Sequence, residues 1–95
     1  MLNAEIIGNI LKELRDNKGL TQEQLSGLAA LDRTHYSKLE RGLRSPTIET
    51  LFKIAQALDI MPHEIIKIIE NRINIEYKNI DWGGILPPHY LFITL

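Results

Sequence analysis

The sequence contains no cysteine and no long apolar run. Without cysteine, the chain has no disulfide, no thiolate metal ligand and no cysteine nucleophile. Its longest purely apolar stretches are only a few residues, and no basic region precedes a hydrophobic stretch near the start. We therefore expect neither a membrane span nor a signal peptide, and a soluble cytoplasmic protein is the default expectation.

An excess of charge of one sign is also lacking. The 11 Lys and Arg residues against 12 Asp and Glu residues give a net charge of −1 with His neutral. No global field attracts the chain to a polyanion, so a nucleic-acid site must be local. Ninety-five residues leave room for one domain. The 44% of apolar residues suffices for a small core, but domains this short are marginal, which favours a partner subunit.

No arrangement of titratable residues indicates catalysis or metal binding. His63 and Glu64 begin a segment one residue away from the zinc-protease pattern, but Lys67 stands where the second histidine is needed. His35 and His89 have no acidic or histidine partner nearby in the sequence. The chain also lacks a phosphate-cradling glycine loop. We expect no enzymatic activity, no metal and no cofactor.

Five amphipathic helices are predicted over residues 1–71. Apolar residues recur there at three- and four-residue steps, which gathers them on one face of a helix. Residue types that begin or end helices stand between these segments: Gly19, Thr21 with Gln24, Asp32, Gly42, Ser45 to Thr47, and Pro62. The first part of the chain is therefore predicted to be an all-α domain.

Residues 72–95 differ in pattern from the rest and are predicted as a C-terminal extension. Ile73, Ile75 and Tyr77 alternate with polar neighbours, and residues 90–95 are rich in aromatic and β-branched types. Both stretches are typical of strands, and two glycines and two prolines separate them. The sequence predicts a short β appendage.

The segment from Gln22 to Arg41 has the length and pattern of a helix-turn-helix. Small residues, Ser26 and Ala29, stand where the two helices cross, and Ala30 lies in the turn. The predicted inward positions are Leu25, Leu31, Tyr36 and Leu39, and the outward positions of the second helix are Arg33, Thr34, Ser37 and Lys38. An arginine at the start of such a helix can bind guanine O6 and N7 bidentately. Residues 33–44 hold four basic residues and one acidic residue, which concentrates positive charge where DNA would bind.

The run TQEQLSGLAALDRTHYSKLERGLRSPTIETLFKIAQAL resembles the XRE, or lambdoid Cro and repressor, class of helix-turn-helix domains. The resemblance covers about residues 6–69 and rests on the linked pattern TQEQL, LERG and SPTIETLFKIAQAL. It implies a five-helix lambda-repressor-like fold that binds double-stranded DNA. The run LDRTHYSKLERG also resembles the recognition helix of restriction-modification controller proteins.

The resemblance implies a role for each outward residue. Base edges would be contacted by Arg33, Thr34, His35 and Lys38, with Ser37 on the same face. Phosphates would be held by Gln22, Arg44 and Thr47, where helix starts favour an anion. Arg15 and Glu40 match a family pair that ties the first helix to the third, which implies a structural salt bridge.

Three residues differ from the types that a helix-turn-helix usually has at their positions. Ala30 stands where the family usually has glycine, and Tyr36 where it usually has a β-branched aliphatic residue. Gly27 lies inside the predicted second helix and costs about 1 kcal/mol relative to alanine. None of the three removes an outward contact residue.

A homodimer on a roughly palindromic operator is expected, because a protein that reads DNA with one helix usually needs two copies for half-sites about 34 Å apart. The isoleucines of the fifth helix spread over roughly 160°, wider than one core-facing stripe. The predicted interface is Ile65, Ile68, Ile69, Ile73, Ile75, Tyr77, Trp82, Leu91 and Ile93.

Two alternatives stay open at this point. The extension can simply cover the surplus apolar surface of the fifth helix. In the other alternative, the chain is an antitoxin-like interaction module whose extension binds a partner protein. The sequence does not distinguish activation from repression.

Overall fold

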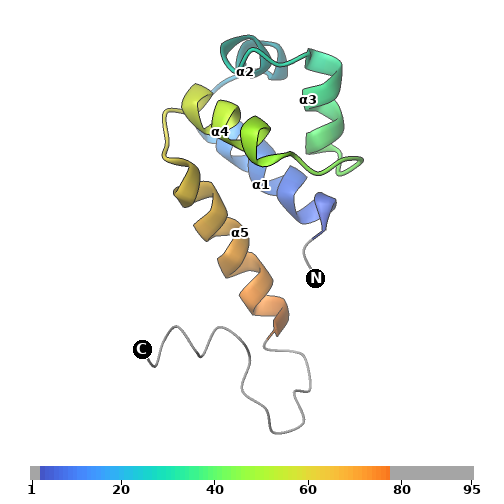
Figure 1. Ribbon diagram of the computed structural model, residues 1–95, viewed down its shortest axis with the longest axis vertical. Coiled ribbons are helices and arrows are strands. Elements are labelled where there is room, and N and C mark those ends of the chain that lie inside the picture. The colour runs from blue at the N-terminus through green and yellow to red at the C-terminus, as the bar shows by residue number, and fades with distance from the viewer. Residues whose placement is uncertain (1–2, 78–95) are drawn as a thin grey trace, which may run out of the picture.

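The computed structural model describes residues 3–77, which fold into five helices without a strand (Figure 1). The helices are α1 (Ala4–Asn17), α2 (Gln22–Leu28), α3 (Arg33–Glu40), α4 (Ile48–Ala57) and α5 (Pro62–Tyr77). The first four form a compact group, and the end of α5 extends beyond them. The predicted all-α, five-helix architecture is confirmed.

Side-chain caps fix where the first four helices begin. The cap residues are Asn3, Thr21, Asp32 and Thr47. The predicted capping box is present: Thr21 Oγ1 accepts a hydrogen bond from the Gln24 amide at 3.0 Å, and Gln24 Oε1 accepts one from the Thr21 amide at 2.9 Å. Gly19 and Gly42, which follow α1 and α3, have φ of 69° and 75°, as helix-terminating residues do.

One hydrophobic core draws side chains from all five helices. Its buried members are Ile7, Ile10, Leu11, Leu25, Tyr36, Leu39, Leu51, Ile54, Ala55, Leu58, Ile65, Ile69 and Ile73. The predicted inward positions of the helix-turn-helix are confirmed by this cluster, with Leu31 packed against it and partly buried. The core therefore holds α2 and α3 on a frame made of α1, α4 and α5.

Helix α1 lies directly on the end of α3 because Gly8 has no side chain. A Cβ at Gly8 would stand 2.5 Å from the carbonyl oxygens of both Leu39 and Glu40. Any side chain there would force the two helices apart, since real Cβ atoms essentially never come so close. Gly42 makes a similar approach to the start of α1, where a Cβ would be 2.8 Å from Glu5 Cα.

The predicted strand over Ile73, Ile75 and Tyr77 is wrong, because α5 continues to Tyr77. Ile73 follows Ile69 by four residues and lies with it in the core, so the helical spacing extends past the expected boundary at residue 71. No glycine or proline after Pro62 interrupts the helix in this range. The second predicted strand, residues 90–95, lies outside the described residues.

The predicted dimer interface on α5 also requires correction. Ile65, Ile69 and Ile73 are buried at 0%, 7% and 9% exposure within the chain's own core, and Ile68 packs partly buried against it. Helix α5 contacts both α1 and α4, so its wide apolar arc is used by two neighbouring helices. These isoleucines offer little surface to a second subunit. The other predicted interface residues lie outside the part of the chain whose side chains the structure describes: Ile75, Tyr77, Trp82, Leu91 and Ile93. The alternative in which the extension binds a partner protein gains no support.

Candidate nucleic-acid interface

Helices α2 and α3 meet through a tight turn. Ser26 and Ala29 are buried at 2% and 4% exposure, as expected of the small residues at a helix crossing. Ala30 adopts φ of 55°, the left-handed conformation that favours the glycine usual in the family. The turn is closed by a hydrogen bond of 2.9 Å from the Leu31 amide to the Ser26 carbonyl oxygen. Alanine therefore preserves the turn and accepts a strained backbone.

Helix α3 presents one buried and one accessible side. Tyr36 and Leu39 are fully buried, whereas Arg33 and Thr34 are exposed at the start of the helix. His35, Ser37 and Lys38 are half-buried. The Asp32 carboxylate caps this helix by accepting a hydrogen bond from the His35 amide at 3.1 Å. The structure thus brings the predicted base-contacting residues together on one short helix.

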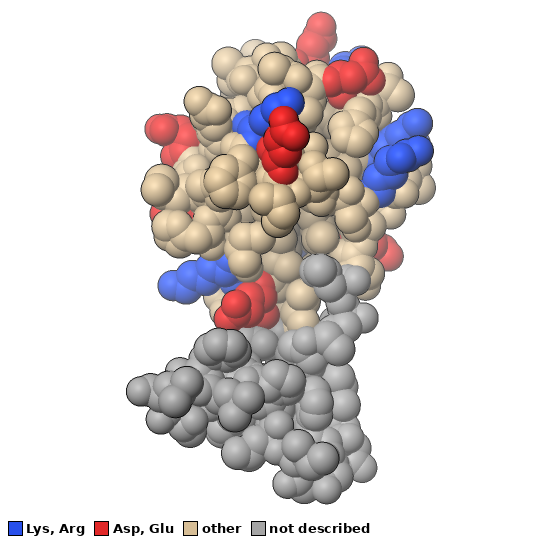
Figure 2. Space-filling view, in the orientation of Figure 1, with Lys and Arg blue, Asp and Glu red and all other residues tan. Residues whose placement is uncertain are grey.

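Positive charge gathers around α3 and the loop that follows it. Arg33, Lys38, Arg41 and Arg44 all keep accessible surface there. Figure 2 shows basic side chains at the edge of the molecule where α3 and this loop lie. The one acidic residue of the segment, Glu40, is buried and paired with Arg15, so its charge is compensated inside the protein. The accessible charges contributed by residues 33–44 are therefore four cations, in a chain of net charge −1.

The predicted phosphate contacts lie at helix starts and in the α3–α4 loop. Arg44 is exposed in the loop. Thr47 is exposed, and its Oγ1 accepts a hydrogen bond from the Thr50 amide at 3.1 Å as the cap of α4. Gln22 is the first residue of α2 and is half-buried, with its Nε2 donating to Glu40 Oε1 at 3.0 Å. Gln22 thus has a structural partner that the sequence did not indicate.

The ion pair of Arg15 and Glu40 is present and ties α1 to the end of α3. Arg15 Nε donates to Glu40 Oε2 at 2.6 Å, and Arg15 Nη2 donates to Glu40 Oε1 at 3.0 Å. Arg15 Nη1 also donates to the Leu20 carbonyl oxygen at 2.7 Å. The Glu40 side chain is only 3% exposed, so this bidentate pair is shielded from solvent.

This environment shifts the pKa values of both partners. The hydrogen bond to Glu40 raises the pKa of Arg15, against the opposing effect of burial. Burial alone would raise the pKa of Glu40, but the surrounding donors of Arg15, Tyr36 and Gln22 outweigh it and lower that pKa below its usual value. Glu40 is therefore held as a carboxylate.

Tyr36 is the buried residue whose surroundings sequence reasoning missed. Its side chain is fully buried on α3, with its hydroxyl beside the Glu40 carboxylate. Burial, and then the nearby Glu40 carboxylate, raise the pKa of Tyr36 above its usual value. The departure from a β-branched residue was visible in the sequence, but the position of its hydroxyl beside an ion pair was not.

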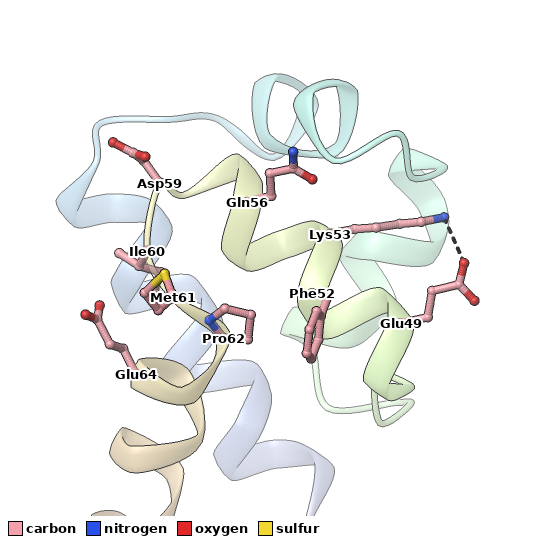
Figure 3. Close-up of a pocket in the computed structure, with 9 residues that line it drawn as sticks. All are labelled: Glu49, Phe52, Lys53, Gln56, Asp59, Ile60, Met61, Pro62 and Glu64. Atoms are coloured by element: carbon pink, nitrogen blue, oxygen red, sulfur yellow. Dashed lines mark ion pairs between the residues drawn. The ribbon is translucent and has the colours of Figure 1, made fainter.

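A second surface feature is a shallow groove between α4 and the start of α5, which we call the α4–α5 groove (Figure 3). It is lined by Glu49, Phe52, Lys53, Gln56, Asp59, Ile60, Met61, Pro62 and Glu64. Phe52 and Met61 are 56% and 58% exposed. Ile48, one helical turn before Phe52, is 69% exposed. Large apolar residues therefore line or flank a solvent-facing surface.

Ile48 and Phe52 are apolar residues of α4 that do not face the core. Leu51, Ile54 and Leu58 form the buried stripe of that helix. Phe52 is 100° from Leu51 around an ideal helix and so falls outside the stripe. Sorting the apolar residues of α4 by their angle around the helix axis, and not by apolar character alone, would have revealed this exposed surface.

Within residues 3–77, no group of three or more His, Asp or Glu side chains is arranged to hold a metal ion. In the same part of the chain, no helix has the length and apolar character needed to cross a membrane.

Comparisons with known proteins find helix-turn-helix regulators and controller proteins. A family model described as helix-turn-helix, HTH_3, matches residues 11–66. The chain is 39% identical over 62 residues to the uncharacterized HTH-type transcriptional regulator y4dJ of Sinorhizobium fredii, covering 65% of this chain and 80% of that protein. It is 42% identical over 64 residues to the control protein C.MunI of a Mycoplasma species, covering 66% and 86%. The crystal structure of the restriction-modification controller protein C.AhdI from Aeromonas hydrophila matches with a TM-score of 0.63 and 44% identity, over 65% of this chain and 94% of that one.

Proposed function

Because this chain belongs to the helix-turn-helix family, we propose that it is a sequence-specific, DNA-binding transcription regulator without enzymatic activity. The observation that carries the proposal is α3, which is fixed in the core by Tyr36 and Leu39 and exposes Arg33 and Thr34 at its start. A helix held in this way can enter the major groove with its first residues at the base edges. By this proposal the protein works in the cytoplasm, in contact with its DNA.

Direct base recognition is assigned to the first turns of α3. Arg33 is exposed and can contact a guanine bidentately, a contact that contributes about 1 to 3 kcal/mol of discrimination. Thr34, His35 and Lys38 would contact neighbouring base edges, with Ser37 beside them. The resemblance of this helix to that of restriction-modification controller proteins supports a similar role in the control of transcription. The resemblance does not specify the operator sequence.

Phosphate contacts are assigned to the residues around α3. Arg44 is exposed in the loop and would bind a phosphate without regard to sequence. Thr47 begins α4, where free backbone amides favour an anion. Gln22 begins α2 and would hold a phosphate on the other side of the recognition helix. Such contacts fix the register of the protein on the duplex.

A homodimer is part of the proposal, with the α4–α5 groove as its interface in place of the buried isoleucines. Phe52 and Met61 are exposed in the groove, and Ile66, one turn after Pro62 on α5, is 43% exposed. Lys53 in the groove lies 3.8 Å from Glu49 of its own helix, so the part of this surface that suits a second copy is its exposed apolar side chains. Two subunits also provide the contact area that a single small module lacks on DNA.

The experiment that tests the DNA function begins with selection of a binding site from a random DNA library by the protein itself. Fluorescence anisotropy then compares the selected site with a shuffled site at fixed, near-physiological salt. We expect a large preference for the selected site and a binding curve steepened by dimerisation. Failure to enrich any sequence, or equal affinity for both DNAs, would overturn the proposal.

Two variants separate base reading from phosphate binding. Arg33→Ala should lose preference at one base pair, by about 5- to 150-fold, which corresponds to the 1 to 3 kcal/mol of a bidentate contact. Arg44→Ala should weaken binding to every sequence and reduce the salt dependence of affinity. Equal losses on selected and shuffled DNA for both variants would contradict this division of roles.

A further inference from the structure

An open cleft beside the start of α3, which we call the Arg33 cleft, holds charged side chains of both signs. It lies between the end of α1, the start of α2 and the first residue of α3, and its charged lining residues are Arg15, Asp16, Glu23 and Arg33. Glu23 and Arg33 are both exposed. The cleft therefore places an acidic side chain of α2 near the arginine to which guanine recognition is assigned.

The other charged groups around this cleft already have partners. Arg15 Nη1 lies 3.4 Å from Asp16 Oδ1. Asp32, which precedes Arg33, uses its carboxylate to cap α3. Glu23 and Arg33 take part in none of the ion pairs that the described residues form. Among these acids, Glu23 is therefore the one whose carboxylate is available to Arg33.

The lack of a pair between Glu23 and Arg33 in the free protein has a physical reason. An exposed ion pair contributes little, because water screens the charges and two long side chains lose conformational freedom. Binding to DNA reduces both costs. Contact with a base edge orders the Arg33 side chain, and the duplex displaces water around it, which strengthens the attraction between the two charges.

The guanidinium group of Arg33 has enough donors for a base and a carboxylate together. A guanidinium group carries five N–H donors in one plane. A bidentate contact with guanine O6 and N7 uses two of them. A carboxylate that accepts from a remaining donor fixes the orientation of the guanidinium plane. This orientation matters because both donors must point at the edge of the same base.

We propose that Glu23 is a positioning residue for base recognition, whose carboxylate accepts a hydrogen bond from Arg33 on DNA and holds the guanidinium group against guanine. Its negative charge also repels the phosphates, so Arg33 is less free to bind a phosphate on an unrelated sequence. Glu23 thus lowers affinity for DNA in general and raises the preference for guanine at one base pair. This inference rests on the proposed DNA-binding function.

The test compares Glu23→Gln with the matched control Asp16→Asn. Both variants remove one negative charge from the Arg33 cleft, but Asp16 is already paired with Arg15. Fluorescence anisotropy gives their affinities for shuffled DNA, for selected DNA, and for selected DNA changed at the base pair that Arg33→Ala identifies. Glu23→Gln should bind shuffled DNA more tightly and lose preference at that base pair by about two- to five-fold. Asp16→Asn should leave the preference unchanged.

The Arg33→Ala background shows whether Glu23 acts through the arginine. There, Glu23→Gln should change preference at no base pair, because the guanidinium group that the carboxylate orients is gone. A Glu23 carboxylate that accepts directly from a cytosine amino group would instead change preference at another base pair in both backgrounds. That result would overturn the proposal.

The outcomes also separate this inference from the proposed function. If the natural chain prefers its selected DNA and Glu23→Gln changes affinity equally for every site, the carboxylate acts only as a repelling charge. The inference is then refuted while the function stands. The same conclusion follows if Asp16→Asn loses as much preference as Glu23→Gln. If the natural chain prefers no sequence, the proposed function fails, and the inference fails with it.

Discussion

At the residue scale, the stability of the domain depends on pH through Glu40. Its carboxylate is held ionised in the folded protein, with a pKa below the usual 4.5. The resulting stability is present above the unfolded-state pKa and is lost as pH falls through the lower folded-state pKa. We expect the free energy of unfolding to decline below about pH 4.5, and to decline less steeply for Glu40→Gln. Urea unfolding between pH 3 and 7 measures this; identical slopes for both proteins would contradict the assignment.

Removal of Arg15 should be more damaging than its place on a charged helix suggests. Arg15→Met leaves the buried Glu40 carboxylate without its main partner, which typically costs about 3 to 5 kcal/mol of stability. The exposed Lys12→Met on the same helix serves as the matched control and should change stability by about 0.5 kcal/mol or less. Chemical denaturation checks both variants, and similar losses for the two would show that the ion pair contributes little.

The limits of sequence reasoning at this scale are visible in one cluster. The Arg15 and Glu40 pair follows from resemblance, because residue types at matching positions are enough to imply it. The hydrogen bond from Gln22 to Glu40 and the place of the Tyr36 hydroxyl beside that carboxylate depend on side-chain geometry within a few ångströms. Composition and spacing carry no information about such distances.

At the element scale, two helical glycines should respond oppositely to alanine. A Cβ at Gly27 in α2 meets no atom within 4 Å, so Gly27→Ala should stabilise the protein by up to about 1 kcal/mol through helix propensity. Gly8→Ala in α1 should destabilise it strongly, because its Cβ would meet backbone oxygens of α3 at 2.5 Å. Thermal unfolding midpoints that move in the same direction would contradict this contact between α1 and α3.

Helix boundaries were predictable where side chains mark them. Thr21, Asp32 and Gly42 act through local hydrogen bonds or backbone angles, and each stands where the sequence placed it. The end of α5 was missed because alternating apolar residues at 73, 75 and 77 are compatible with both a strand and a helix. Tertiary contact of Ile73 with the core, which the sequence does not display, decides for the helix.

At the scale of the whole molecule, the proposed dimer places Phe52 in its interface, where a charged side chain would be unfavourable. Phe52→Glu should weaken self-association by at least ten-fold, because it puts a carboxylate where two apolar surfaces meet. Leu28→Glu, at a 65% exposed position on α2 outside the groove, is the matched control and should leave the dimer intact. Sedimentation equilibrium measures both. Equal association constants for the two variants would place the interface elsewhere.

The close contact at Gly8 also affects the nucleic acid. Because α1 lies on the carbonyl groups that end α3, and Arg15 and Gln22 both bind Glu40, the recognition helix is fixed to the rest of the domain. In the proposed dimer, two recognition helices fixed in this way would adapt little to the duplex, so we expect the duplex to bend or to change its groove width in order to fit both. The energy of that deformation depends on base-pair stacking, and it gives the operator sequence preferences at positions that no side chain touches.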